Sequence, residues 1–207
     1  MSRTIFKPFG PSILKVKMPE ELVKKINEYT DKKSKEKIEG GKLDAGHDLA
    51  GNVTQEIYLD QKFMEESGFG KFLLGEVSNW ISQTKNKNIK KFQITGSWIV
   101  RQFQNEYNPI HMHSGHISGV GYTKVPTNLG NTKQKNKPNK NGHLQLIHGS
   151  KSFLSNAIMD ILPEVGDFYF FPHYVMHAVY PFSDSNEERR SVSFNALLDD
   201  EIYFSTH

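Results

Sequence analysis

The chain has 207 residues, a net charge of +3 and no cysteine. This length can bury a full hydrophobic core, and the absence of cysteine excludes disulfides, thiolate metal ligands and cysteine nucleophiles. The small positive charge does not by itself indicate nucleic acid as a partner. No run of about 18 apolar residues is present, so no membrane span is expected.

The N-terminal part, residues 1–90, is predicted to be mainly helical. Apolar residues alternate over 14–18, which predicts a half-buried strand, and residues 53–59 predict a second short strand. Between them, apolar residues at helical spacing predict a helix over 19–41, with Pro19 at its start and Gly40-Gly41 at its end.

A second helical region is predicted after Asp60, which is placed to cap it. Apolar residues recur at helical spacing from Phe69 to Ile81 and form a stripe that suits burial against a core. Gly68 and Gly70 are expected to break this region into two pieces.

From residue 91 onward, short segments rich in β-branched and aromatic residues alternate with turn signals, which is typical of strands. These segments are 91–103, 116–125, 142–147, 166–172, 174–182 and 190–198. The Lys/Asn-rich stretch 128–142 predicts a mobile, solvated loop. The expected fold is α+β: one domain over 1–207, in which 91–207 form a double-stranded β-helix (jelly roll) with the N-terminal helices packed on one sheet.

Three of the nine histidines fall within six residues of the stretch NPIHMHSGHISGVGY, residues 108–122. His111 and His113 stand two residues apart, so in an extended segment both imidazoles point to one face. Paired neutral imidazoles suit a divalent metal, and His177 in a later strand segment is the candidate third ligand. His116 is expected to have a positioning or structural role.

A second cluster is the stretch EERRSVSFN, residues 187–195. Strand alternation places Arg189 and Ser191 on one face and Arg190 on the other. Arginine can bind a carboxylate through two parallel hydrogen bonds. Arg189 and Ser191 near a metal therefore predict a site for one end of a dicarboxylate whose other end contacts the metal. A simple surface turn is the alternative.

The segments HMH, SGVGY, GDFYFFPHYVMHAVYP and RRSVSFN together resemble the 2-oxoglutarate- and Fe(II)-dependent oxygenases over about residues 92–198. The resemblance is strongest to small members encoded by phages, and LAGNVTQE at 49–56 shares it more weakly. It implies an Fe(II) site at His111, His113 and His177. It also implies that Arg189 and Ser191 hold 2-oxoglutarate. For Tyr122 the two alternatives are a hydrogen bond to the co-substrate and a place in the core.

The sequence departs from the family pattern at one ligand, because His113 stands where a carboxylate is usual. Three histidines would carry one more positive charge than two histidines and a carboxylate. Alternatively His113 does not bind, and the metal has two histidine ligands. Glu106 and Asp167 are the nearby carboxylates in the sequence, and Asp167 is expected in a turn.

The resemblance implies an enzyme of the dioxygenase type that hydroxylates a prime substrate with O2, with a peptidyl residue as the candidate substrate. The alternatives are a cupin-like metal protein, such as a three-histidine dioxygenase or isomerase, and a non-enzymatic jelly-roll binding module. Trp98 and Gln102 are candidates to line the pocket, with packing in the core as the favoured alternative. The expected location is the cytoplasm, of the host cell if a phage encodes the chain. No membrane partner is expected, and nucleic acid is kept as the less favoured partner, at the basic loop 128–142.

Overall fold

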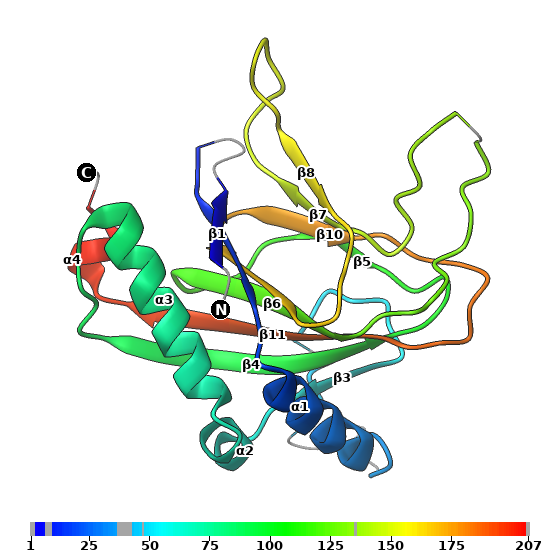
Figure 1. The fold of residues 1–207 in the computed structure, drawn as a ribbon, viewed down its shortest axis with the longest axis horizontal. Helices are drawn as coiled ribbons and strands as arrows, with labels where there is room; N and C mark the ends of the chain where they lie inside the picture. The colour runs from blue at the N-terminus through cyan, green and yellow to red at the C-terminus, as the bar shows by residue number, and fades with distance from the viewer. Residues whose placement is uncertain (1–2, 7–9, 37–42, 47, 135, 206–207) are drawn as a thin grey trace.

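The fold rests on two antiparallel sheets that face each other across a buried layer (Figure 1). The computed structural model describes residues 3–6, 10–36, 43–46, 48–134 and 136–205. In spatial order the seven-stranded sheet comprises β1 (Arg3–Phe6), β2 (Ile13–Lys17), β9 (Asp167–Pro172), β6 (Ile117–Lys124), β11 (Arg189–Leu198), β4 (Phe92–Gln102) and β3 (Gln55–Tyr58). The four-stranded sheet comprises β5 (Asn108–His111), β10 (Met176–Val179), β7 (Leu144–Ile147) and β8 (Ile158–Ile161).

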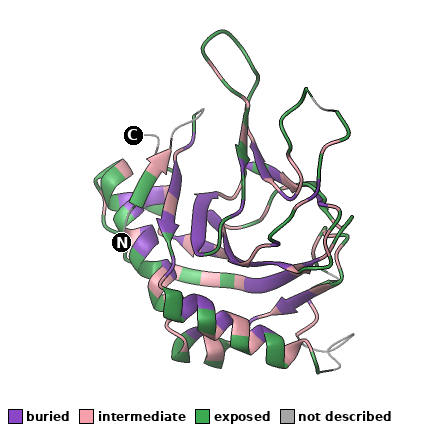
Figure 2. Ribbon diagram, turned by 45° about the vertical axis from the view of Figure 1, so that its right-hand side comes forward, coloured by how far each residue is buried: buried purple, intermediate pink, exposed green. Residues whose placement is uncertain are grey.

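The helices α1 (Glu20–Lys33), α2 (Gln61–Glu66) and α3 (Phe69–Lys85) cover the outer face of the large sheet, and the short α4 (Asp200–Tyr203) follows β11. Their apolar sides pack on the large sheet, and the purple buried positions of Figure 2 lie between these layers. The predicted double-stranded β-helix with helices on one sheet is therefore confirmed. None of the helices in the described part combines the length and apolar character needed to span a bilayer.

Several predicted elements have different limits in the structure. The first helix ends at Lys33, well before Gly40 and Gly41, which lie outside the described residues. Gly68 has a φ of 83° and separates α2 from α3, but Gly70 lies inside α3 and interrupts nothing. The predicted cap at Asp60 is present, because its side chain accepts a hydrogen bond from the Phe63 amide at 2.8 Å.

The N-terminal part contributes more to the large sheet than the prediction of a helical segment before residue 91 implied. β2 pairs with β9, β1 pairs with β2, and β3 pairs with β4. The two N-terminal strands extend one edge of the sheet and β3 forms the other. In the described residues of 128–142 there is no helix or strand, as predicted, and the mobility of this stretch stays a prediction.

β11 lies between β6 and β4 near the middle of the large sheet. One of its faces packs under the helices, and the other faces the smaller sheet. Val192 and Phe194 are fully buried among the residues under the helices. On that same face the Arg190 guanidinium donates to Glu188 at 2.7 and 2.8 Å and to Asp31 of α1 at 2.6 Å. These contacts tie α1 to the sheet through a buried cation whose charge is compensated.

We expect Arg190→Ala to lower the free energy of unfolding by about 3 kcal/mol, because it leaves the mostly buried Glu188 with one cationic partner fewer. Urea denaturation would measure this. The matched control is Lys33→Ala, which removes only an exposed ion pair to Glu36 and should cost about 0.5 kcal/mol or less. Equal losses in the two variants would contradict a structural role for Arg190.

Candidate metal centre

His111 and His177 face each other across the two neighbouring strands that form one end of the smaller sheet. The antiparallel register of β5 and β10 makes them direct partners, and their ring centroids lie 4.3 Å apart. His177 is 5 % exposed, and the interior face of β10 places its ring beside the buried Phe171. The pairing brings together residues that are far apart in the sequence.

His113 completes the group from the turn that follows β5. Its ring centroid lies 5.0 Å from that of His111 and 4.9 Å from that of His177. His173 fixes the backbone at this point, because the His113 amide donates to the His173 carbonyl and the His173 ring donates to the His113 carbonyl at 2.9 Å. The potential ligand atoms of the three histidines all lie within 4.8 Å of one another.

Hydrogen bonds to carbonyl groups set the tautomers of two of these imidazoles. Nδ1 of His111 lies 2.7 Å from the Pro109 carbonyl, and Nδ1 of His177 lies 3.0 Å from the Val175 carbonyl. A carbonyl only accepts, so each Nδ1 must carry the hydrogen and each Nε2 keeps a lone pair. Metal-binding histidines in proteins are commonly held in this way.

All three imidazoles are neutral near pH 7. Burial, and then the neighbouring histidines, lowers the pKa of His177 to about 3. Burial, followed by His111 and His173, lowers the pKa of His113 to about 4, and burial also lowers the pKa of His111. Neutral imidazole is the form that binds a metal, so protons compete weakly for this site.

Arg189 and Ser191 line the same cavity as the three histidines, on the inner face of β11. The Arg189 side chain is almost fully buried, donates from Nη1 to the Gln102 amide oxygen at 3.0 Å, and stacks 5.0 Å above the Tyr122 ring. Its Nε and Nη2 have no hydrogen-bond partner among the described residues. A buried guanidinium with free donors is costly to maintain unless an anion binds it.

Tyr122 lies below Arg189 and is fully buried, but it is not one of the residues that line the cavity. Its hydroxyl has no partner among the described residues, and burial raises its pKa, so the phenol is neutral and can donate. Gln102, expected in the core, is buried as predicted and contacts Arg189 directly. Trp98 is also buried as predicted and lines the cavity, with its ring 5.4 Å from that of His113.

The other candidates from the sequence lie outside the metal group. The His116 ring stacks on Tyr203 and accepts a hydrogen bond from the Leu198 amide, which is a structural role. The prediction of a turn at Asp167 is wrong, because Asp167 is the first residue of strand β9, where it pairs with Lys15 and Lys17. The Glu106 carboxylate is bound to Thr54 and to the Phe103 amide, so neither carboxylate replaces His113.

Among the cavity residues that the sequence reasoning did not assign are Glu56 of β3 and Asn108 of β5. Glu56 is 4 % exposed, and its Oε1 has no partner among the described residues. Burial, and then the Asp44 carboxylate, raises the pKa of Glu56 to about 7. The resemblance of 49–56 to the phage-type oxygenases was the one signal that pointed to this segment.

The part of the chain that contains the candidate site is similar to a known protein family. Residues 96–195 match the model of the family described as "Putative 2OG-Fe(II) oxygenase", a span that holds all three histidines and both Arg189 and Ser191. No curated protein matches the chain.

Solved structures share the fold at low identity. A prolyl-4-hydroxylase of Pseudomonas putida is 15% identical, with a TM-score of 0.56 over 88% of this chain and 91% of that one. The viral collagen prolyl hydroxylase of Paramecium bursaria Chlorella virus-1, in its 2OG complex, is 14% identical, with a TM-score of 0.57 over 89% and 94%. HygX of Streptomyces hygroscopicus, with nickel, 2-oxoglutarate and hygromycin B bound, is 11% identical, with a TM-score of 0.57 over 91% and 83%.

Proposed function

We propose that this chain, whose residues 96–195 belong to the 2OG-Fe(II) oxygenase family, binds Fe(II) through His111, His113 and His177 and 2-oxoglutarate through Arg189 and Ser191. The family uses Fe(II) and 2-oxoglutarate and consumes O2 together with a prime substrate. Our proposal for this chain is hydroxylation, with a peptidyl residue as the candidate substrate. The proposed location is the cytoplasm, where reduced iron and 2-oxoglutarate are both available.

The observation that carries the proposal is that two unsatisfied sets of groups share one cavity. Three neutral imidazoles converge at one side of it, and a buried guanidinium with two free donors lies on β11. The first set suits a divalent metal and the second suits a carboxylate. 2-Oxoglutarate carries a metal-chelating end and a distal carboxylate, so it matches both sets at once.

When bound, Fe(II) and 2-oxoglutarate supply the oxidising chemistry, in which O2 is reduced as 2-oxoglutarate becomes succinate and CO2 and a C–H bond is hydroxylated. The chain contributes the metal ligands, a carboxylate-binding arginine and the orientation of both. His111 and His177 present Nε2 lone pairs that their own Nδ1 hydrogen bonds orient. Gln102 and the Tyr122 ring hold the Arg189 guanidinium in place, and Ser191 offers a hydroxyl on the same strand face.

An anaerobic titration tests the proposal most directly. Addition of 2-oxoglutarate to the Fe(II)-loaded protein should produce a weak visible charge-transfer band that saturates at one equivalent. Succinate, which lacks the keto group that chelates the metal, is the control and should give no such band. Iron binding without the band would remove 2-oxoglutarate from the proposal.

The role of His113 is tested separately, because the converging group has three histidines and no carboxylate, a ligand set that the cupin-like alternative shares. If His113 binds the metal, His113→Asp should keep Fe(II) binding within about tenfold of the parent, because a carboxylate also serves as an iron ligand. His113→Ala should weaken it further. Anaerobic equilibrium dialysis gives both values, and parent-like affinity in His113→Ala would leave a metal held by two histidines.

A further inference from the structure

Glu56 is an acid and Arg189 is a base, both line one cavity, and no hydrogen bond or ion pair joins them among the described residues. Both are at least nine-tenths buried, and both keep polar atoms without a partner among the described residues. On the proposed function, the distal carboxylate of 2-oxoglutarate occupies Arg189. The Glu56 carboxylate then remains as an unpaired acidic group in the same cavity, and a ligand that neutralises it would remove a desolvation cost.

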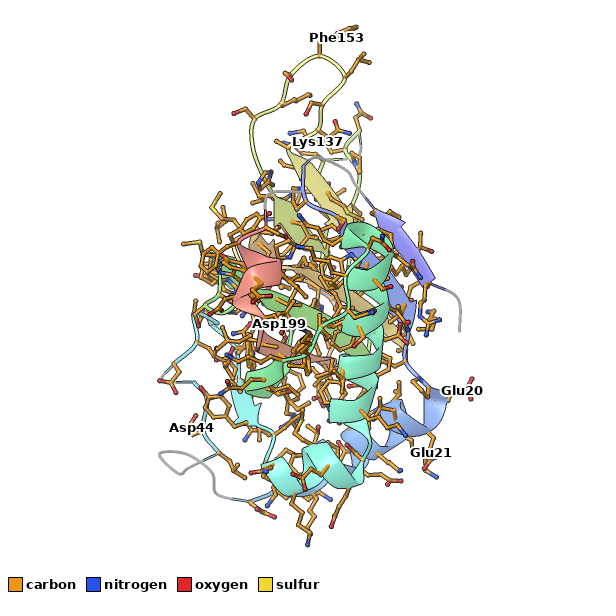
Figure 3. All side chains as sticks on the ribbon, turned by 90° about the vertical axis from the view of Figure 1, so that its left-hand side faces the viewer. Glu20, Glu21, Asp44, Lys137, Phe153 and Asp199 are labelled. Carbon is orange, nitrogen blue, oxygen red and sulfur yellow. The ribbon has the colours of Figure 1, made fainter. Side chains whose placement is uncertain are left out.

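The chain around Glu56 is acidic although the whole protein carries a net positive charge. The segment from Leu43 to Tyr58 contains Asp44, Asp48 and Glu56 but no lysine or arginine. Figure 3 labels Asp44, which lies at the outer side of the molecule on this segment. Such a segment creates a negative local potential that attracts cations and repels anions.

Glu56 lies between the metal cavity and a second hollow and lines both. The metal cavity is lined by Leu49, Ala50 and Glu56 on this side. The second hollow is bounded by Asp44, Gly46, Gly51 and residues 53–56, so that Glu56 borders both spaces. Glu56 is therefore the acidic side chain that the lining of the metal cavity shares with the acidic segment.

Gly51 leaves space for the Glu56 carboxylate. A Cβ placed on Gly51 would lie 2.7 Å from Glu56 Oε1 and 2.9 Å from the Asn108 amide nitrogen, which is closer than real contacts allow. The Trp98 ring lies on the lining of the same cavity, and an indole face attracts cations. The Glu56 carboxylate and the Trp98 indole are therefore the two groups on this side of the cavity that can bind a positively charged nitrogen.

We propose that Glu56 is a substrate-binding residue and that the prime substrate carries a cationic nitrogen, of the ammonium or guanidinium kind, which Glu56 binds beside the metal centre. The inference rests on the proposed function, in which 2-oxoglutarate occupies Arg189, and it adds the chemical class of the substrate.

The test uses three capped tripeptides as probes, acetyl-Gly-Lys-Gly-amide, acetyl-Gly-Arg-Gly-amide and the neutral acetyl-Gly-norleucine-Gly-amide. Their dissociation constants are measured by calorimetry or ligand-observed NMR on the metal-free protein and on the protein with Mn(II) and 2-oxoglutarate. At least one cationic peptide should bind about tenfold more tightly than the norleucine peptide, because it pairs with a desolvated carboxylate. Glu56→Gln should remove this preference while retaining binding of Mn(II).

Two further variants sharpen the result. Gly51→Ala should also weaken the cationic peptide, because the added methyl displaces the Glu56 carboxylate. Asp48→Asn removes an equal charge from the same segment, but Asp48 is exposed and bound to the Tyr58 hydroxyl, so the preference should change by about twofold or less. Thermal melting checks that each variant is folded.

Three results would overturn the inference. The first two are equal binding of the cationic and neutral peptides and an unchanged preference in Glu56→Gln. The third is no binding of either cationic peptide at about 10 mM, because such an ion pair should bind more tightly than that. The metal-free arm keeps the two proposals distinct. If the charge-transfer titration fails but the cationic preference survives in the metal-free protein, the oxygenase proposal is wrong and the cation site stands.

Discussion

His177→Ala is expected to abolish stoichiometric Fe(II) binding, with an affinity loss of more than about 100-fold. The substitution removes one of the converging imidazoles and leaves a small void at a position that is 5 % exposed. His111→Ala should have the same effect, because His111 is the cross-strand partner of His177 and offers its lone pair to the same point. Anaerobic equilibrium dialysis followed by metal analysis measures the stoichiometry directly.

The matched control is His116→Ala, which removes a histidine from the same stretch of the sequence. His116 contacts Tyr203 and the Leu198 amide and is not a member of the converging group. It should therefore retain most of the bound iron, and loss of the Tyr203 stack should lower its stability relative to the parent. A normal metal content in His177→Ala would exclude this site.

Arg189→Ala is expected to raise the dissociation constant of 2-oxoglutarate by about 30-fold or more, with Fe(II) still bound. A charge-assisted contact in a desolvated site costs roughly 2–5 kcal/mol when it is truncated, because the partner carboxylate is left buried and unpaired. Titration of the Fe(II)-loaded protein with 2-oxoglutarate, followed by the charge-transfer band, gives the constant.

Arg190→Ala is the comparison, measured at a temperature at which that variant is still folded. Its guanidinium faces α1 and is bound by Glu188 and Asp31, so the 2-oxoglutarate constant should change little. The reverse ranking would make Arg190 the residue that binds the co-substrate. Small and equal effects from both arginines would favour the cupin-like alternative, which has no 2-oxoglutarate.

The elements that could be predicted from the sequence are those in which apolar and polar residues repeat with the period of a strand or of a helix. Alternation along β11 assigned Arg189 and Arg190 to opposite faces, and the structure places them so. Strands such as β8 were missed because edge strands bury few residues: Ile158 is 48% exposed. β1 was missed for the same reason, since Arg3 and Thr4 are exposed and leave no apolar alternation.

Prediction of the site was limited by information that only tertiary contacts contain. Histidine spacing suggested His111, His113 and His177, but their approach depends on the register in which β10 pairs with β5. Glu56 is one glutamate in a short strand, and nothing in its local pattern indicates that its carboxyl group is buried beside the histidines. The contact between Gln102 and Arg189 likewise joins residues that are 87 positions apart.

The two faces of β11 have a consequence for how this protein can vary. A slip of one residue would turn Arg190 toward the histidines and Arg189 toward α1, but it would also turn Val192 and Phe194 out of the layer under the helices. The strand register that buries Val192 and Phe194 therefore also fixes Arg189 on the face of the cavity. Natural variants should tolerate insertions in the connection before Glu188 far better than within the strand, where a shift in frame would disrupt folding and recognition together.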